Sequence, residues 1–176
     1  MIALSSSSPP SPSSIINVAG SRDASTVSFN PETFKYTIKF DEKTTETTIT
    51  DKAVIIDQWI QDINVQCSPY LSVIFGLDFE RNSSKTSVAG KKPATLHLCI
   101  DDKCLILQLK HIDNFPLSLK NFLKNPNFFF VGFGVVDDIN SIGKDYGLDW
   151  GVHADIKVIV MENGPFGFRL GFEECS

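Results

Sequence analysis

The sequence lacks several features that mark whole classes of protein. No stretch approaches the roughly 18 consecutive apolar residues of a membrane-spanning helix, so we expect no membrane partner. The N-terminus has no basic segment followed by an apolar one, which disfavours a secretory signal and favours an intracellular location, in the nucleus or the cytoplasm. Net charge is −5, from 16 lysines and arginines against 21 aspartates and glutamates. This balance excludes a broad basic surface for nucleic acid, so any such contact needs a local site or metal ions.

Cysteine is scarce and is not arranged as in zinc sites. The four cysteines are Cys67, Cys99, Cys104 and Cys175. They form no C-x-x-C pair and have no histidines at matching spacing, which argues against a structural zinc ion. Cys99 and Cys104 could face each other across a hairpin, but in a reducing compartment we expect them to be small core residues instead.

Composition divides the chain into three segments. Residues 5–14 read SSSSPPSPSS, a tract that cannot bury apolar surface, so we expect residues 1–30 to be disordered. The chain has 176 residues, 42% of them hydrophobic, which is enough for one core; we place that domain in residues 31–156. Residues 157–176 form an atypical tail.

Apolar periodicity predicts a mixed sheet with helices packed on it. Alternating, β-branched or continuous apolar runs predict strands over 34–40, 44–50, 73–77, 95–100, 104–109, 128–135 and 152–156. Helical spacing predicts helices over 53–63, 115–123 and 137–146. After a first hairpin and helix, three meandering strands are followed by helix, strand, helix, strand. This α/β order resembles that of ribonuclease-H-like folds.

Two carboxylates follow the first continuous apolar strand. Asp78 and Glu80 lie two residues apart, so on a strand their side chains project from the same face. Placing two carboxylates together costs free energy through desolvation and mutual repulsion, and a divalent cation removes that cost. Oxygen ligands suit Mg²⁺ or Mn²⁺. The alternative is that Asp78 and Glu80 simply begin a solvated loop.

A third candidate ligand, Asp138, follows the second buried strand and starts a predicted helix. A carboxylate at this position also stabilises the helix N-terminus, which is the alternative reading. Asp137 competes for either role.

The order and context of these residues resemble DEDD-type 3′–5′ exonucleases, and most closely the Werner-exonuclease-like group found in plants. The run G-L-D-F-E resembles the first exonuclease motif, and G-F-G-V-V-D-D resembles the second, which places its aspartate on Asp138 rather than Asp137. Residues 93–99 look like the family's A-x-L-Q-L segment, with His97 where glutamine is usual. Residues 116–123 look like its P-x-x-L-x-x-(Phe/Leu)-Leu helix. The resemblance covers roughly residues 34–156.

This resemblance implies a two-metal nuclease that removes nucleotides from the 3′ end of DNA or RNA. Asp78 would bridge two Mg²⁺ or Mn²⁺ ions, Glu80 would bind the first, and Asp138 would hold the second, through water. The sequence departs from the family at its third motif, a Tyr-x-x-x-Asp or His-x-x-x-x-Asp on a helix far downstream, because the resemblance ends near residue 156 without it. We therefore expect the final helical part to be missing and catalysis to be impaired. The alternative function is a non-catalytic module that binds nucleic acid or regulates a relative.

The residues near and beyond the end of the resemblance carry three further expectations. Asp155 matches an aspartate of the last strand rather than the third-motif ligand, and His153 reads as a surface histidine rather than a general base. An Asn-Gly turn signal inside residues 157–176 predicts a β-hairpin. Its apolar stripe would be a surface for self-association. The stripe consists of Phe166, Phe168, Leu170 and Phe172.

Overall fold

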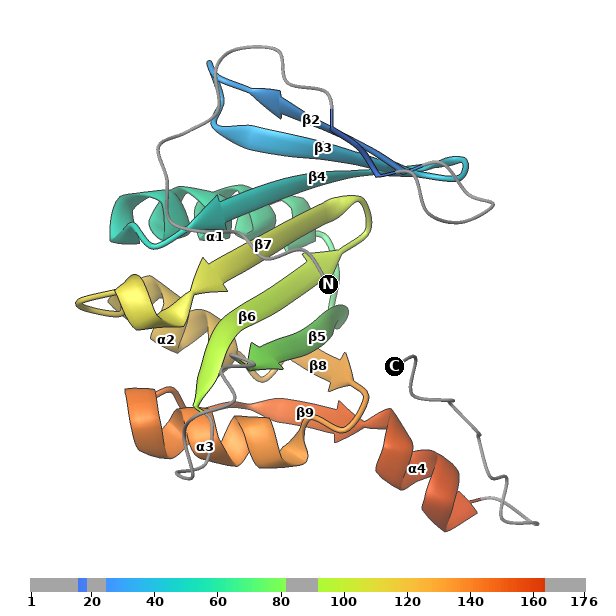
Figure 1. Cartoon of the computed structure of the whole chain (residues 1–176). Coiled ribbons are helices and arrows are strands. Elements are labelled where there is room, and N and C mark those ends of the chain that lie inside the picture. Colours follow the sequence, from blue (N-terminus) through green and yellow to red (C-terminus); the bar gives the residue numbers. More distant parts are fainter. Residues whose placement is uncertain (1–15, 19–24, 82–91, 164–176) are drawn as a thin grey trace, which may run out of the picture.

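The computed structural model describes residues 16–18, 25–81 and 92–163, and from β3 to β9 its elements follow the predicted order (Figure 1). The strands are β1 (Ile16–Val18), β2 (Ser25–Asn30), β3 (Lys35–Phe40), β4 (Lys43–Thr50), β5 (Val73–Arg81), β6 (Pro93–Ile100), β7 (Lys103–Gln108), β8 (Phe128–Gly132) and β9 (Val152–Asp155). The helices are α1 (Ala53–Cys67), α2 (Leu117–Leu123), α3 (Val136–Tyr146) and α4 (Ile156–Asn163), with a 3-10 turn at Leu109–His111. None of these described helices is long and apolar enough to cross a membrane.

The described strands form one nine-stranded mixed sheet in the order β1-β2-β3-β4-β7-β6-β5-β8-β9. Strands β5, β6 and β7 are the predicted antiparallel meander. Strands β8 and β9 each follow a helix and add in parallel beyond β5. The first hairpin joins the same sheet through the parallel pair β4 and β7. The arrangement is therefore the mixed α/β sheet that the sequence predicts.

The core lies on one face of the sheet. Along β5, buried and exposed side chains alternate, with Phe75 fully buried and Ile74 68% exposed. Helices α1 and α2 lie on the far side of the sheet in Figure 1, where their apolar side chains meet the buried face. Helix α3 adds Ile139 and Ile142 to the same core. The opposite face of β5 is open among the described residues, and this is the face that carries the predicted site.

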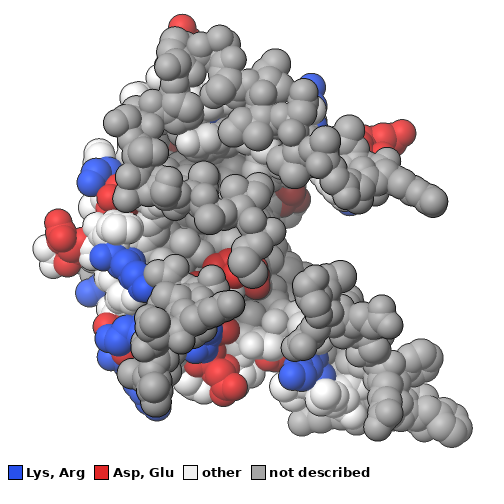
Figure 2. All heavy atoms as spheres, in the orientation of Figure 1, with Lys and Arg blue, Asp and Glu red and all other residues white. Residues whose placement is uncertain are grey.

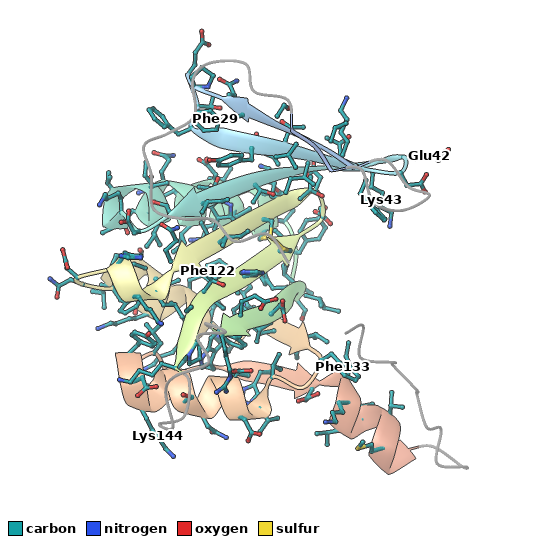
Figure 3. The ribbon with its side chains drawn as sticks, viewed as in Figure 1. Phe29, Glu42, Lys43, Phe122, Phe133 and Lys144 are labelled. Atoms are coloured by element: carbon teal, nitrogen blue, oxygen red, sulfur yellow. A yellow bond between two sulfur atoms is a disulfide. The ribbon has the colours of Figure 1, made fainter. Side chains whose placement is uncertain are left out.

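Phenylalanine, which occurs 14 times in the sequence, fills much of this core. The ring of Phe122 from α2 lies 5.1 Å from that of Phe75 and 5.0 Å from that of Phe128, between centroids (Figure 3). Phe75 also stacks on Phe130 of β8 at 5.5 Å. These aromatic contacts fix β8 beside β5, and so they fix the strand ends that position the candidate site.

Two of the predicted segments are corrected by the structure. Residues 1–30 are not disordered throughout, because β2 pairs with β3 over Ser25–Asn30 and β1 extends the same edge. The predicted C-terminal hairpin is wrong in its first arm, residues 158–161, because these residues belong to helix α4. The second arm of that hairpin, with its apolar stripe and the proposed self-association, lies outside the described residues.

Cys99 and Cys104 are joined by a disulfide in the structure, so the expectation of two unlinked core cysteines is wrong. The two residues are directly opposite each other in the β6–β7 register, which the sequence did suggest. Cys67 is free and buried in α1, and burial raises the pKa of its thiol. A protonated, buried thiol is a packing residue rather than a nucleophile.

Candidate functional site

Asp78 and Glu80 lie on the open face of β5, at its C-terminal end. The strand alternates strictly, so Leu77 and Phe79 point into the core while the two acidic side chains point out. The side chain of Asp78 is 62% exposed. The prediction that both carboxylates share one face is confirmed.

Strand β6 places a histidine beside this pair. Asp78 is opposite His97 in the β5–β6 register, and the Nδ1 atom of His97 lies 3.7 Å from Oδ2 of Asp78. The other ring nitrogen, Nε2, is 3.0 Å from the hydroxyl of Thr95, which is itself opposite Glu80. The imidazole is therefore oriented by one neighbour and faces a predicted metal ligand with its other nitrogen.

Asp138 is delivered to the same end of the sheet by β8 and α3. Strand β8 is the parallel neighbour of β5, so the two strands end at the same edge. A side chain at Gly132 would collide with the carbonyl oxygen of Leu77 and with Val135, so glycine is required there. Gly134 has φ +69°, which glycine adopts at little cost. The two glycines turn the chain sharply from β8 into α3.

In the first turn of α3, Asp137 is exposed, whereas the side chain of Asp138 is only 15% exposed. The Nε atom of Arg81 donates a hydrogen bond to Oδ1 of Asp138 at 2.8 Å, and Nη2 contacts the same oxygen. Arg81 is the last residue of β5, directly after Glu80. The structure therefore places Asp138 against Arg81, the residue that directly follows the predicted pair Asp78 and Glu80.

The site fits a divalent ion by the chemistry of its donors. Asp78 and Glu80 offer the carboxylate oxygens that Mg²⁺ and Mn²⁺ prefer, at a strand end open to solvent. Among the residues that the structure describes, however, no three acidic, histidine or cysteine side chains lie close enough together to hold a metal ion. In this arrangement Oδ1 of Asp138 is engaged by Arg81.

Asp155 has a role that sequence reasoning missed. Its carboxylate is buried and accepts hydrogen bonds from the backbone amides of Gly134 at 2.8 Å, Val136 at 3.3 Å and Lys157 at 2.9 Å. Burial raises its pKa, but these hydrogen bonds outweigh burial and leave the pKa below its ordinary value. One carboxylate thus holds the beginnings of α3 and α4. In the sequence, the only sign of this role is that Asp155 is an aspartate near the end of a predicted strand.

His153 is an exposed residue whose Nδ1 atom lies 3.3 Å from the carbonyl oxygen of Gly151. The prediction of a surface histidine is confirmed. It lines a shallow depression of about 330 Å³ between α3 and residues 148–153. That depression contains none of the three predicted ligands, so it is separate from the candidate site.

The open face of β5 carries acidic side chains. Figure 2, in the orientation of Figure 1, shows acidic side chains near the middle of this view, with lysine or arginine side chains close by. Glu80 and Asp78 add two negative charges at one strand end without a basic neighbour on the same face of β5. A polyanion would meet repulsion here unless cations intervened.

Comparison with known proteins places the fold. No family model and no curated protein matched the sequence. Among solved structures, the EXD2 exonuclease domain soaked in Mg matches with TM-score 0.54 and 18% sequence identity over 65% of this chain and 58% of that chain. The same domain soaked in Mn and GMP matches with TM-score 0.55 and 18% identity, over 66% and 58%. The chain thus spans under two thirds of these domains and has the ribonuclease-H-like fold of an exonuclease domain.

Proposed function

We propose that this chain is a 3′–5′ exonuclease domain of the DEDD type that hydrolyses the terminal phosphodiester bond of DNA or RNA with Mg²⁺ or Mn²⁺. The observation that carries the proposal is the pair Asp78 and Glu80, side by side on the open face of the central strand and next to the strand that leads to Asp138. The fold shared with an exonuclease domain supports it. The 3′–5′ direction of cleavage is inferred from the resemblance of the sequence motifs to those of Werner-like exonucleases.

The residues have distinct roles in this proposal. When bound, the divalent ions supply the charge that activates water and stabilises the leaving 3′ oxygen. By the resemblance to DEDD exonucleases, Asp78 would contact both ions, and Glu80 would hold the water-activating one. Asp138 would hold the other from the start of α3. His97 lies beside Asp78 on the neighbouring strand, with its Nδ1 atom 3.7 Å from Oδ2 of that carboxylate.

We propose that nucleic acid binds through these ions rather than through a basic surface. The chain has a net charge of −5, and the site itself is acidic. Bound cations invert the local field and attract the phosphate. Affinity for an oligonucleotide should therefore depend on divalent ions and be weak in their absence.

We propose that the activity of these 176 residues is low. After Asp138 they contain no Tyr-x-x-x-Asp or His-x-x-x-x-Asp, so the residue that orients the attacking water in the DEDD family has no counterpart there. Losing such a residue commonly lowers the rate on the order of 10²–10⁴-fold. The expected behaviour is slow, metal-dependent shortening rather than rapid digestion.

The test is digestion of 5′-labelled single-stranded and double-stranded oligonucleotides, in DNA and in RNA, with Mg²⁺ or Mn²⁺. The proposal predicts a ladder of labelled products that shorten from the 3′ end. The ladder should disappear in Asp78→Asn and in Glu80→Gln and persist in Asp102→Asn, a matched change at the exposed β6–β7 turn. Retarded but uncut substrate would instead identify a binding module. Immediate release of the label as a mononucleotide would contradict the 3′–5′ direction.

A further inference from the structure

Arg81 reaches α3 from the end of β5. The β5–β6 register shifts between Glu80 and Arg81, so that Glu80 is opposite Thr95 and Arg81 is opposite Pro93. Alternation along the strand turns the side chain of Arg81 away from the face that Asp78 and Glu80 occupy. From there it reaches Asp138, 57 residues away in sequence.

The contact is specific in geometry and in charge. Two nitrogens of the guanidinium, Nε and Nη2, converge on the single oxygen Oδ1 of Asp138. The Asp138 side chain is 15% exposed and that of Arg81 is 38% exposed, so the pair is partly shielded from water. A shielded carboxylate requires a counter-charge, and arginine stays protonated under all ordinary conditions.

From this geometry we infer that Arg81 takes the place of a metal ion at Asp138 and competes with it. The inference rests on the proposed function, because it concerns the predicted ligand for the second ion. Guanidinium and a divalent ion would both engage the same carboxylate. A guanidinium held on Oδ1 repels a cation brought to the other oxygen, so the two compete for Asp138. Arg81 thereby lowers the affinity of the site for divalent ions. Without bound metal, its guanidinium balances the negative charge of Asp138.

The inference predicts that removing the arginine strengthens metal binding. Hydrogen bonds to charged groups contribute more than ordinary ones, and 1.4 kcal/mol corresponds to tenfold in affinity. We expect Arg81→Gln to bind Mn²⁺ roughly tenfold more tightly than the unaltered chain, as measured by titration calorimetry on the full chain. Arg81→Lys keeps the charge but loses the forked contact, so its affinity should fall between the two.

Two controls separate this effect from a general change of charge. Lys92 pairs with Asp145 of the same helix at 3.2 Å, so Lys92→Gln removes one positive charge near α3 without touching Asp138. It should leave Mn²⁺ affinity nearly unchanged. The double variant Arg81→Gln with Asp138→Asn should lose the gain, because the freed ligand is gone. Thermal unfolding of each variant verifies that it is folded.

The outcomes also distinguish this inference from the proposed function. Equal affinities in Arg81→Gln, Lys92→Gln and the unaltered chain, with binding lost in Asp78→Asn, would overturn the competition by Arg81 while leaving the metal site of the proposed function intact. An equal gain in Arg81→Gln and Lys92→Gln would reduce the effect to bulk charge and overturn the inference. Absence of Mn²⁺ binding in every folded variant would overturn both.

Discussion

Asp155 accepts a hydrogen bond at 2.8 Å from the backbone amide of Gly134, and this contact ties the last strand of the sheet to the turn before α3. The same carboxylate also accepts from the amides of Val136 and Lys157. The first turn of a helix has amides without intrahelical partners, so a fixed carboxylate there stabilises the turn. Asp155 therefore holds the helix that presents Asp138, although it is not itself at the proposed metal site.

Replacing Asp155 with asparagine should destabilise the protein. The variant keeps the shape but loses the charge, and one acceptor oxygen becomes an amide group that faces backbone donors. We expect a loss of about 2 kcal/mol in the free energy of unfolding, measured by urea denaturation. Asp149→Asn is the matched control, because Asp149 is an exposed partner of Lys124 and should give little change. Equal midpoints for the two variants would contradict this role of Asp155.

Acid should remove the contribution of Asp155. Burial raises its pKa, but the backbone hydrogen bonds lower the pKa by more, so the folded-state pKa lies below the ordinary 3.8. A depressed pKa contributes stability that is present above the unfolded value and is lost as pH falls through the folded value. The free energy of unfolding should therefore decline as pH drops below about 4. Asp155→Asn should show a shallower decline over this range, and parallel pH curves for the two proteins would argue against it.

Gly132 should tolerate no side chain. A methyl group there would meet the carbonyl oxygen of Leu77 and the side chain of Val135, and backbone cannot move aside cheaply. Gly132→Ala should cost about 2 kcal/mol in unfolding free energy. Gly76→Ala on the neighbouring strand is the control, since its methyl group would lie 3.7 Å from the carbonyl oxygen of Cys99, an ordinary contact. A control variant as unstable as Gly132→Ala would show that the close approach is not the cause.

Sequence patterns predicted the parts of the fold that depend on local periodicity. Alternation along β5 correctly placed Asp78 and Glu80 on one face, because side-chain direction on a strand depends only on position. The helix predicted over 137–146 is α3, and it ends at Gly147, which has φ 64° in the left-handed region. The meander and the order of β8 and β9 followed from the same periodicity.

Features that depend on distant contacts were not predictable. The pairing of Arg81 with Asp138 joins residues 57 apart in sequence, and no local pattern marks it. The partners of Asp155 lie in two other elements, so its burial was equally hidden. Helix α4 stands where a strand is predicted: residues 156–160 have strand propensity, but Asp155 accepts a hydrogen bond from the amide of Lys157 in the first turn of the helix. For the site, the sequence predicted Asp138 as a ligand but did not predict its contact with Arg81.

Paramagnetic broadening by Mn²⁺ tests most directly whether Asp78 and Glu80 hold a divalent ion. In a titration followed by NMR of the backbone amides, residues 78–80 should broaden first, before the acidic turn at 101–102. The double variant Asp78→Asn with Glu80→Gln should lose this early broadening while keeping the weak effect at the turn. Broadening that begins at the turn, or that is unchanged in the double variant, would contradict a metal site on the open face of β5.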